Sequence, residues 1–124
     1  MASPQATEPT DVERDELQRD LETLRGELRD AIEGSEQDAR PVELDQPAVG
    51  RVSRIDAIQQ QKMLEANRNA QRARLAQVHA ALDRFAEDEY GDCVACGETI
   101  GFARLKARPE SLYCIACQSA REKR

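Results

Sequence analysis

Two cysteine pairs decide the fold of this chain: Cys93-Val94-Ala95-Cys96 and, after 17 intervening residues, Cys114-Ile115-Ala116-Cys117. They contain all four cysteines of the 124-residue sequence. Two C-x2-C knuckles at this spacing bring four thiolates to one tetrahedral Zn²⁺. The segment between them is too short for a hydrophobic core, so a metal has to supply the folding free energy. The sequence therefore predicts one zinc ion, which is structural because four cysteines leave no coordination position open.

The alternatives for these cysteines are a pair of disulfides or a redox-active C-x-x-C motif. Disulfides are typical of secreted proteins, and the start of the chain has neither a basic segment nor an apolar run. A redox motif is typical of a βαβ unit, and no such pattern surrounds the cysteines. Both observations favour zinc.

The composition favours long helices over a large globular core. Hydrophobic residues make up 40% of the chain, but aromatic residues make up only 3%, and 34% of residues are charged. No run of about 18 apolar residues occurs, so we expect no membrane segment and a cytoplasmic protein. We also expect a monomer. Residues 1–50 hold 14 acidic and 5 basic side chains, against 10 and 13 in residues 51–124. The acidic half argues against wrapping around duplex nucleic acid, because such binding draws most of its free energy from neutralising phosphates.

The first predicted helix covers residues 11–33 and follows a disordered arm, residues 1–9. Thr10 and Glu13 form a capping box at its start, and Glu33-Gly34 is its expected end. Its apolar residues recur at coiled-coil spacing. These residues are Leu17, Leu21, Leu24, Leu28 and Ala31 or Ile32.

The second predicted helix begins at another capping box, Ser53 to Asp56, and runs to about Glu89. One face carries an apolar stripe that suits the leucines of the first helix. This stripe consists of Ala57, Leu64, Leu75, Val78, Leu82 and Phe85. Arg68 and Gln71 lie beside it, either as a polar break that fixes the pairing or as partner contacts. The fold class is therefore mainly α: an antiparallel two-helix coiled-coil hairpin over residues 10–89, with a zinc finger and a short C-terminal helix in residues 90–124.

Residues 34–52 form the predicted tip loop of the hairpin, because they contain two prolines and two glycines. Ile55 and Ile58 lie away from the apolar stripe of the second helix. We therefore expect the loop to fold over them in a small tip cluster with Leu44, Val49 and Val52.

The chain resembles the DksA/TraR family of bacterial zinc-finger proteins. The resemblance lies in Glu89-Tyr90-Gly91-Asp92-Cys93, in the spacing of the two cysteine pairs, and in the run Ile100 to Pro109 between them. It covers most of residues 53–124, and only the predicted architecture extends it further towards the N-terminus. The resemblance implies a transcription regulator without sequence-specific DNA binding, which binds bacterial RNA polymerase, inserts its coiled-coil tip into the secondary channel and often acts with ppGpp. We expect no enzyme activity, because the sequence shows no nucleophile with a partnered histidine, no Gly-rich phosphate loop and no open metal site.

The resemblance also indicates candidate partner residues. The family has the tip pattern D-x-x-D-x-A. At this place the present chain has a single aspartate, Asp56, with Ser53 and Arg54 before it and Ala57 directly after it, and these four residues are the candidate tip contacts. Asp45 is a second acidic candidate. At the base, Arg104 and Arg108 either brace the zinc centre or meet the partner. The competing functions are a zinc-dependent nucleic-acid-binding module and an adaptor for another protein.

Overall fold

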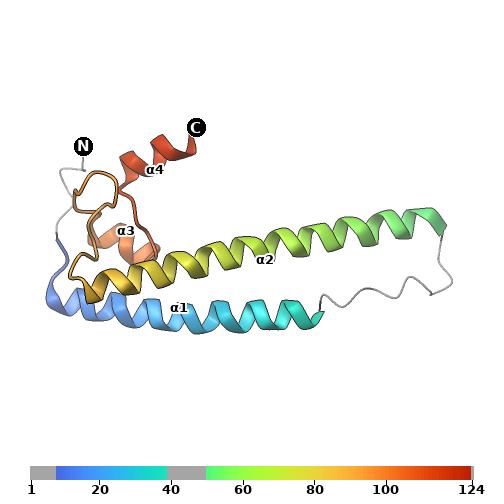
Figure 1. Ribbon diagram of the computed structural model, residues 1–124, viewed down its shortest axis with the longest axis horizontal. Helices are drawn as coiled ribbons and strands as arrows, with labels where there is room; N and C mark the ends of the chain where they lie inside the picture. Colours follow the sequence, from blue (N-terminus) through green and yellow to red (C-terminus); the bar gives the residue numbers. More distant parts are fainter. Residues whose placement is uncertain (1–7, 39–49, 124) are drawn as a thin grey trace. The chain divides into compact units, whose positions relative to one another are not determined.

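The computed structural model describes residues 8–38 and 50–123, with side chains described for residues 8–35 and 54–123. Four helices occur in these ranges: α1 (Asp11–Asp38), α2 (Gly50–Ala86), α3 (Phe102–Ala107) and α4 (Ile115–Glu122), shown in Figure 1. The predicted mainly helical class is confirmed. The chain divides into two compact units, Met1–Gly26 with Ala76–Arg124 and Glu27–Leu75. Within each unit, α1 and α2 lie side by side and antiparallel (Figure 1).

The start of α1 is the predicted capping box. The Thr10 backbone N–H donates to Glu13 Oε1 (2.9 Å), and the Glu13 N–H donates to Thr10 Oγ1 (3.2 Å). The predicted end at Glu33 is wrong, because α1 continues to Asp38. Gly34 lies within the helix, where a glycine costs only about 1 kcal/mol relative to alanine. That cost is too small to end a helix by itself.

The predicted capping box at Ser53 is also wrong, because α2 begins three residues earlier, at Gly50. No proline follows Pro47 until Pro109, so nothing in the chain prevents a helix from starting before Ser53. The predicted loop 34–52 is helical at both ends, and its residues 39–49 lie outside the described residues. At its other end α2 stops at Ala86, and Asp88 adopts a positive φ of 59° in the turn that follows.

The core of the first unit lies where α1 and α2 approach each other beside the finger. Leu17 and Leu21 of α1 and Val78 of α2 are fully buried, as their stripes predict. Ala81 is fully buried, whereas the predicted stripe residue Leu82 is only partly buried, so the most buried position lies one residue before the predicted one. Leu105 of α3, a helix that the sequence did not predict, is also fully buried. Burial of these apolar side chains stabilises the helix pair and holds α3 against it.

Pro9 is buried although the sequence placed it in a disordered arm; residues 1–7 lie outside the described residues. A Cβ on Gly91 would lie 3.8 Å from the Pro9 ring, and Gly91 has a φ of +98° that favours glycine. The positive φ lets the chain turn from α2 into the finger beside Pro9.

The second unit, Glu27–Leu75, is packed less completely. Leu28 is buried, but Leu64 is 44% exposed, so its predicted place in the seam is wrong. Ile55 and Ile58 are 56% and 51% exposed, and the burial expected from a tip cluster is wrong as well. The positions of Leu44 and Val49 and the side chain of Val52 lie outside the described residues. Helical periodicity gave the angular position of these side chains but not how far a neighbour covers them.

Candidate metal centre

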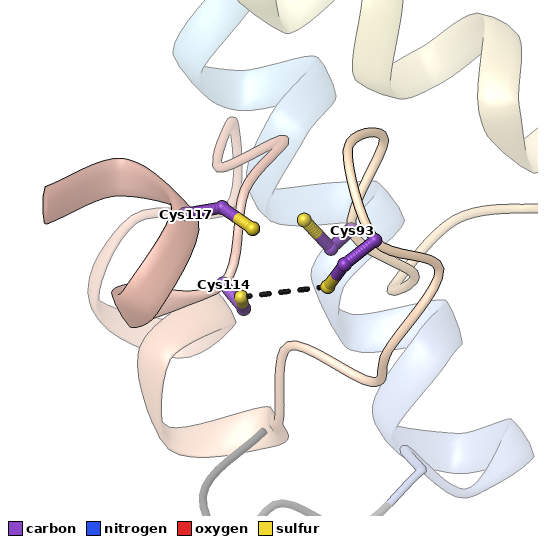
Figure 2. A group of neighbouring side chains, drawn as sticks. Cys93, Cys114 and Cys117 are labelled. Atoms are coloured by element: carbon purple, nitrogen blue, oxygen red, sulfur yellow. Dashed lines mark hydrogen bonds between the residues drawn. The ribbon is translucent and has the colours of Figure 1, made fainter. Parts of the chain in front are cut away.

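The four cysteines converge on one point of the first unit. Cys93 and Cys96 lie in the loop after α2, Cys114 immediately precedes α4, and Cys117 lies in its first turn. All four Sγ atoms lie within 4.8 Å of one another, and Cys96 Sγ is 3.8 Å from Cys114 Sγ. Figure 2 shows the sulfur atoms of Cys93, Cys114 and Cys117 facing a common centre.

This arrangement fits zinc and excludes disulfides. Four Zn–S bonds of about 2.3 Å in a tetrahedron place neighbouring sulfurs about 3.8 Å apart, whereas a disulfide needs about 2.05 Å. All four cysteines are free. Four thiolates also complete the tetrahedral shell, so the site holds one structural zinc ion, as the sequence predicts.

Backbone hydrogen bonds shape the two knuckles and join them. The Gly97 N–H donates to Cys93 O and the Gln118 N–H to Cys114 O, both at 2.9 Å, and these bonds close one turn around each pair. The Val94 N–H donates to Leu112 O (2.9 Å) and thereby links the first knuckle to the segment before the second. Gly97 has a φ of +76°, which explains why glycine follows the first pair.

The thiols differ in how readily they ionise. Burial raises the pKa of Cys93, but hydrogen bonds from the backbone N–H groups of Cys114, Cys96 and Ala95 lower it by more than burial raises it, so that the pKa falls to about 6. Hydrogen bonds with Cys114, Cys93 and Cys96 raise the pKa of Cys117 to about 12. Four neighbouring thiols therefore cannot all ionise by themselves, and zinc supplies the charge that allows it. Binding of the metal releases protons.

The two predicted base arginines have different surroundings. Arg104 is half-buried, and its Nε donates to Tyr113 O at 3.1 Å, next to the ligand Cys114. The Arg108 side chain is 67% exposed, and its Nε lies 3.7 Å from Oε2 of the buried Glu110. Both arginines line a hollow of about 110 Å³. Arg104 thus contacts the finger backbone, whereas Arg108 is available to a partner.

The predicted tip residues lie in the other unit. Arg54 and Asp56 are exposed on α2, and Ala57 is half-buried. Ser53 is a residue of α2 whose side chain lies outside the described residues, as does the whole of Asp45. Arg68 and Gln71 are half-buried; Arg68 Nε and Gln71 Oε1 are buried and have no hydrogen-bond partner within the described part of the chain. Their burial favours the polar break over a partner contact.

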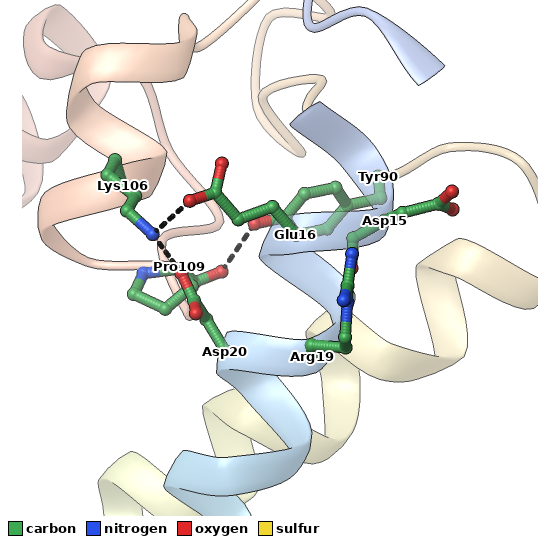
Figure 3. A network of polar contacts seen from close by, with 7 residues as sticks. All are labelled: Asp15, Glu16, Arg19, Asp20, Tyr90, Lys106 and Pro109. Carbon is green, nitrogen blue, oxygen red and sulfur yellow. Dashed lines mark hydrogen bonds and ion pairs between the residues drawn. The ribbon is translucent and has the colours of Figure 1, made fainter. Parts of the chain in front are cut away.

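Contacts that no sequence pattern predicted fasten the finger to α1. Lys106 Nζ of α3 donates to Glu16 Oε1 (2.7 Å) and to Asp20 Oδ2 (2.9 Å), as Figure 3 shows. The Tyr90 hydroxyl donates to Pro109 O at 2.9 Å, and the Tyr90 ring stacks on Phe85 with centroids 4.0 Å apart. The partners of Lys106 lie some 90 positions away in the chain, beyond the reach of local patterns.

None of the described helices is both long enough and apolar enough to cross a bilayer.

Two packed helices with a closed four-cysteine finger define a class: a helical protein that uses zinc for structure. Residues 88–123 match the model of the prokaryotic dksA/traR C4-type zinc finger. The predicted resemblance to the DksA/TraR family is therefore confirmed over the zinc finger.

Individual relatives extend the likeness beyond the finger. The chain is 40% identical over 56 residues to the RNA polymerase-binding transcription factor DksA of Haemophilus influenzae, which is 45% of this chain and 39% of that protein. It is 28% identical over 109 residues to the protein of the same name from Escherichia coli K12, which is 86% of this chain and 69% of that one. The solved structure of transcription factor DksA2 from Pseudomonas aeruginosa superposes with a TM-score of 0.72 at 28% identity, covering 91% of this chain and 85% of that one.

Proposed function

We propose that this protein binds bacterial RNA polymerase and regulates the initiation of transcription. The observation that carries the proposal is the match of 86% of the chain to a DksA whose name states that it binds polymerase. The four-cysteine site adds support, because it retains the structural element on which that family's finger depends. The matched stretch is 69% of the E. coli protein, so the activity of the whole relative comes to this chain as part of the proposal.

The mode of binding that we propose uses the tip residues of the second unit and the finger of the first. The tip, with Arg54, Asp56 and Ala57, enters the secondary channel of polymerase, and the finger contacts its rim. The exposure of Arg54 and Asp56 supports this, because their charged groups are available without any rearrangement. Since no reacting group or open metal position belongs to this mode, the protein acts as a regulator and not as an enzyme. A polymerase partner also implies a cytoplasmic location.

A nucleotide such as ppGpp is the second ligand that we propose, at the interface shared with polymerase. Support comes from the hollow lined by Arg104 and Arg108, which Ser111 and Gln118 also line. The exposed Arg108 guanidinium is suited to bidentate contacts with phosphate oxygens. Glu110 is a buried carboxylate in the same hollow, so a polyanion needs further cations from the partner surface.

The experiment is retention of the purified protein on immobilised RNA polymerase, with and without a competitor that occupies the secondary channel. The wild-type protein should be retained and then displaced by the competitor. Asp56→Ala should weaken retention, whereas Glu65→Ala, an exposed acidic residue on the same helix, should leave it unchanged. Retention that is insensitive to the competitor would exclude the channel, and absence of retention would exclude polymerase as the partner.

A further inference from the structure

Two arginines make equivalent hydrogen bonds, one to each zinc knuckle. Arg84, near the end of α2, donates from Nη2 to Asp92 O at 3.1 Å, and Asp92 immediately precedes Cys93. Arg104 of α3 donates from Nε to Tyr113 O at 3.1 Å, and Tyr113 immediately precedes Cys114. Each knuckle therefore has an arginine on the carbonyl just before its first ligand. We propose that Arg84 and Arg104 are positioning residues that hold Cys93 and Cys114 in the geometry for zinc.

The peptide before Cys93 is held on both sides. Arg84 holds its carbonyl oxygen, and its N–H, which belongs to Cys93, donates to Glu98 O at 2.8 Å. A peptide group is planar, so fixing its oxygen and its N–H fixes the plane from which the Cys93 side chain projects. Arg84 Nη2 also donates to Glu89 O at 3.0 Å, which anchors the whole turn that leads to the ligand.

The peptide before Cys114 is held in the same way but serves a second purpose. Its oxygen accepts from Arg104, and its N–H, which belongs to Cys114, is hydrogen-bonded to the Cys93 thiol. Arg104 thus orients one ligand and, through the same peptide, the donor to another ligand on the opposite knuckle. Figure 2 shows Cys93 and Cys114 on either side of the common centre.

Both arginines are suited to this role by charge and by burial. The four-thiolate zinc centre has a formal charge of about −2, so nearby guanidinium groups offset it. The Arg84 side chain is 19% exposed, and the bond from Arg104 to Tyr113 O is partly buried, so neither contact is readily replaced by water. Partners that orient metal ligands typically contribute 10- to 100-fold to metal affinity when they are tested by mutation. We expect an effect of that order from each arginine.

The experiment measures zinc release from the full-length protein to a chromophoric chelator. Arg84→Met and Arg104→Met, which keep an apolar stem, should each release zinc roughly 10-fold faster, and Arg84→Lys, which keeps a donor, should lie in between. The matched control is Arg14→Met. Arg14 is 20% exposed in the same unit and pairs with Asp88 at 2.9 Å, but among the described residues it makes no hydrogen bond to a carbonyl beside a ligand. Its release rate should equal that of the wild type.

A second measurement separates positioning from a general loss of stability. Replacing zinc by Co²⁺ reports the sulfur geometry through its absorption spectrum, which should change in the Arg84 and Arg104 variants. Leu21→Ala, which removes a fully buried side chain far from the ligands in sequence, should leave that spectrum unchanged. Wild-type release rates in both methionine variants would overturn the proposal. So would faster release from Leu21→Ala than from either arginine variant, because stability would then account for the effect.

Discussion

Three leucines that look equivalent in the sequence should differ in their contribution to stability. Leu21, Leu24 and Leu64 all belong to predicted seam positions, yet Leu21 is fully buried, Leu24 is half-buried and Leu64 is 44% exposed. Replacing each by alanine makes the same chemical change inside a helix, so differences in helix propensity cancel. The series therefore isolates how much each site is packed.

The expected magnitudes follow from burial. Leu21→Ala removes transfer free energy and leaves a cavity, and should lower the free energy of unfolding by about 3 kcal/mol. Leu24→Ala should lower it by a smaller amount, because part of this side chain is already in contact with water in the folded protein. Leu64→Ala should change it by less than about 1 kcal/mol, as is usual at exposed positions. A step of about 1.4 kcal/mol is a tenfold change in the unfolding equilibrium, so the three variants are resolvable.

The measurement is urea denaturation of the zinc-loaded protein, followed by circular dichroism. The unfolding midpoints should fall in the order Leu64→Ala, Leu24→Ala, Leu21→Ala, with little change in slope. Equal losses for Leu21→Ala and Leu64→Ala would refute the reasoning, because they would show that burial in this structure does not determine the energetics of the helix pair.

Two substitutions, a rise in pH and the removal of zinc test the attachment of the finger. Tyr90→Phe leaves the buried Pro109 carbonyl without its donor and should cost about 1 kcal/mol in a thermal melt. Burial of Tyr90, and to a smaller extent the negative charge of Glu110, raises the pKa of the Tyr90 phenol above its ordinary 10.0. As the pH rises above 10, the unfolded chain therefore loses this proton before the folded protein does, and the free energy of unfolding should fall. The fall should be smaller in Tyr90→Phe. Lys106→Met breaks the exposed contacts with α1, so its destabilisation should be smaller in concentrated NaCl than at low salt. Removing zinc with a chelator should make residues 88–123 sensitive to protease while α1 remains helical by circular dichroism.

Local patterns predicted those features whose cause is local. The spacing of four cysteines identified the metal centre, the period of leucines located Leu17 and Leu21, and the Thr10 to Glu13 box fixed the start of α1. The box at Ser53 misled because the same four-residue pattern is compatible with a helix interior.

What the sequence could not provide is information about distant contacts. Helix α3 has six residues, too few to show a period, and it is held by Leu105 in the core. Arg84 and Lys106 look like ordinary surface residues until their partners are known. The exposure of Ile55 and Ile58 was not predictable for the same reason, because burial depends on which segment lies over a residue and not on its own helix.

The distribution of the core leads to a last prediction, which concerns α2 itself. Apart from Leu28, every buried hydrophobic residue of the described chain lies in the unit that contains the finger. The other unit contains the buried Arg68 Nε and Gln71 Oε1 without hydrogen-bond partners among described residues, an arrangement that costs free energy. Amides of α2 before Leu75 should therefore open more readily than amides from Ala76 to Ala86, although one helix contains both.

Native-state hydrogen exchange measures this difference residue by residue. Exchange in residues 54–75 should be faster and should respond to Gln71→Leu, which replaces a buried, unsatisfied acceptor by an apolar side chain and should slow it. Exchange in residues 76–86 should stay unchanged in the same variant, because its protection comes from Val78, Ala81 and the finger. Uniform protection along α2 would show that the helix pair opens as a single unit, and that the unequal distribution of buried side chains has no consequence for its stability.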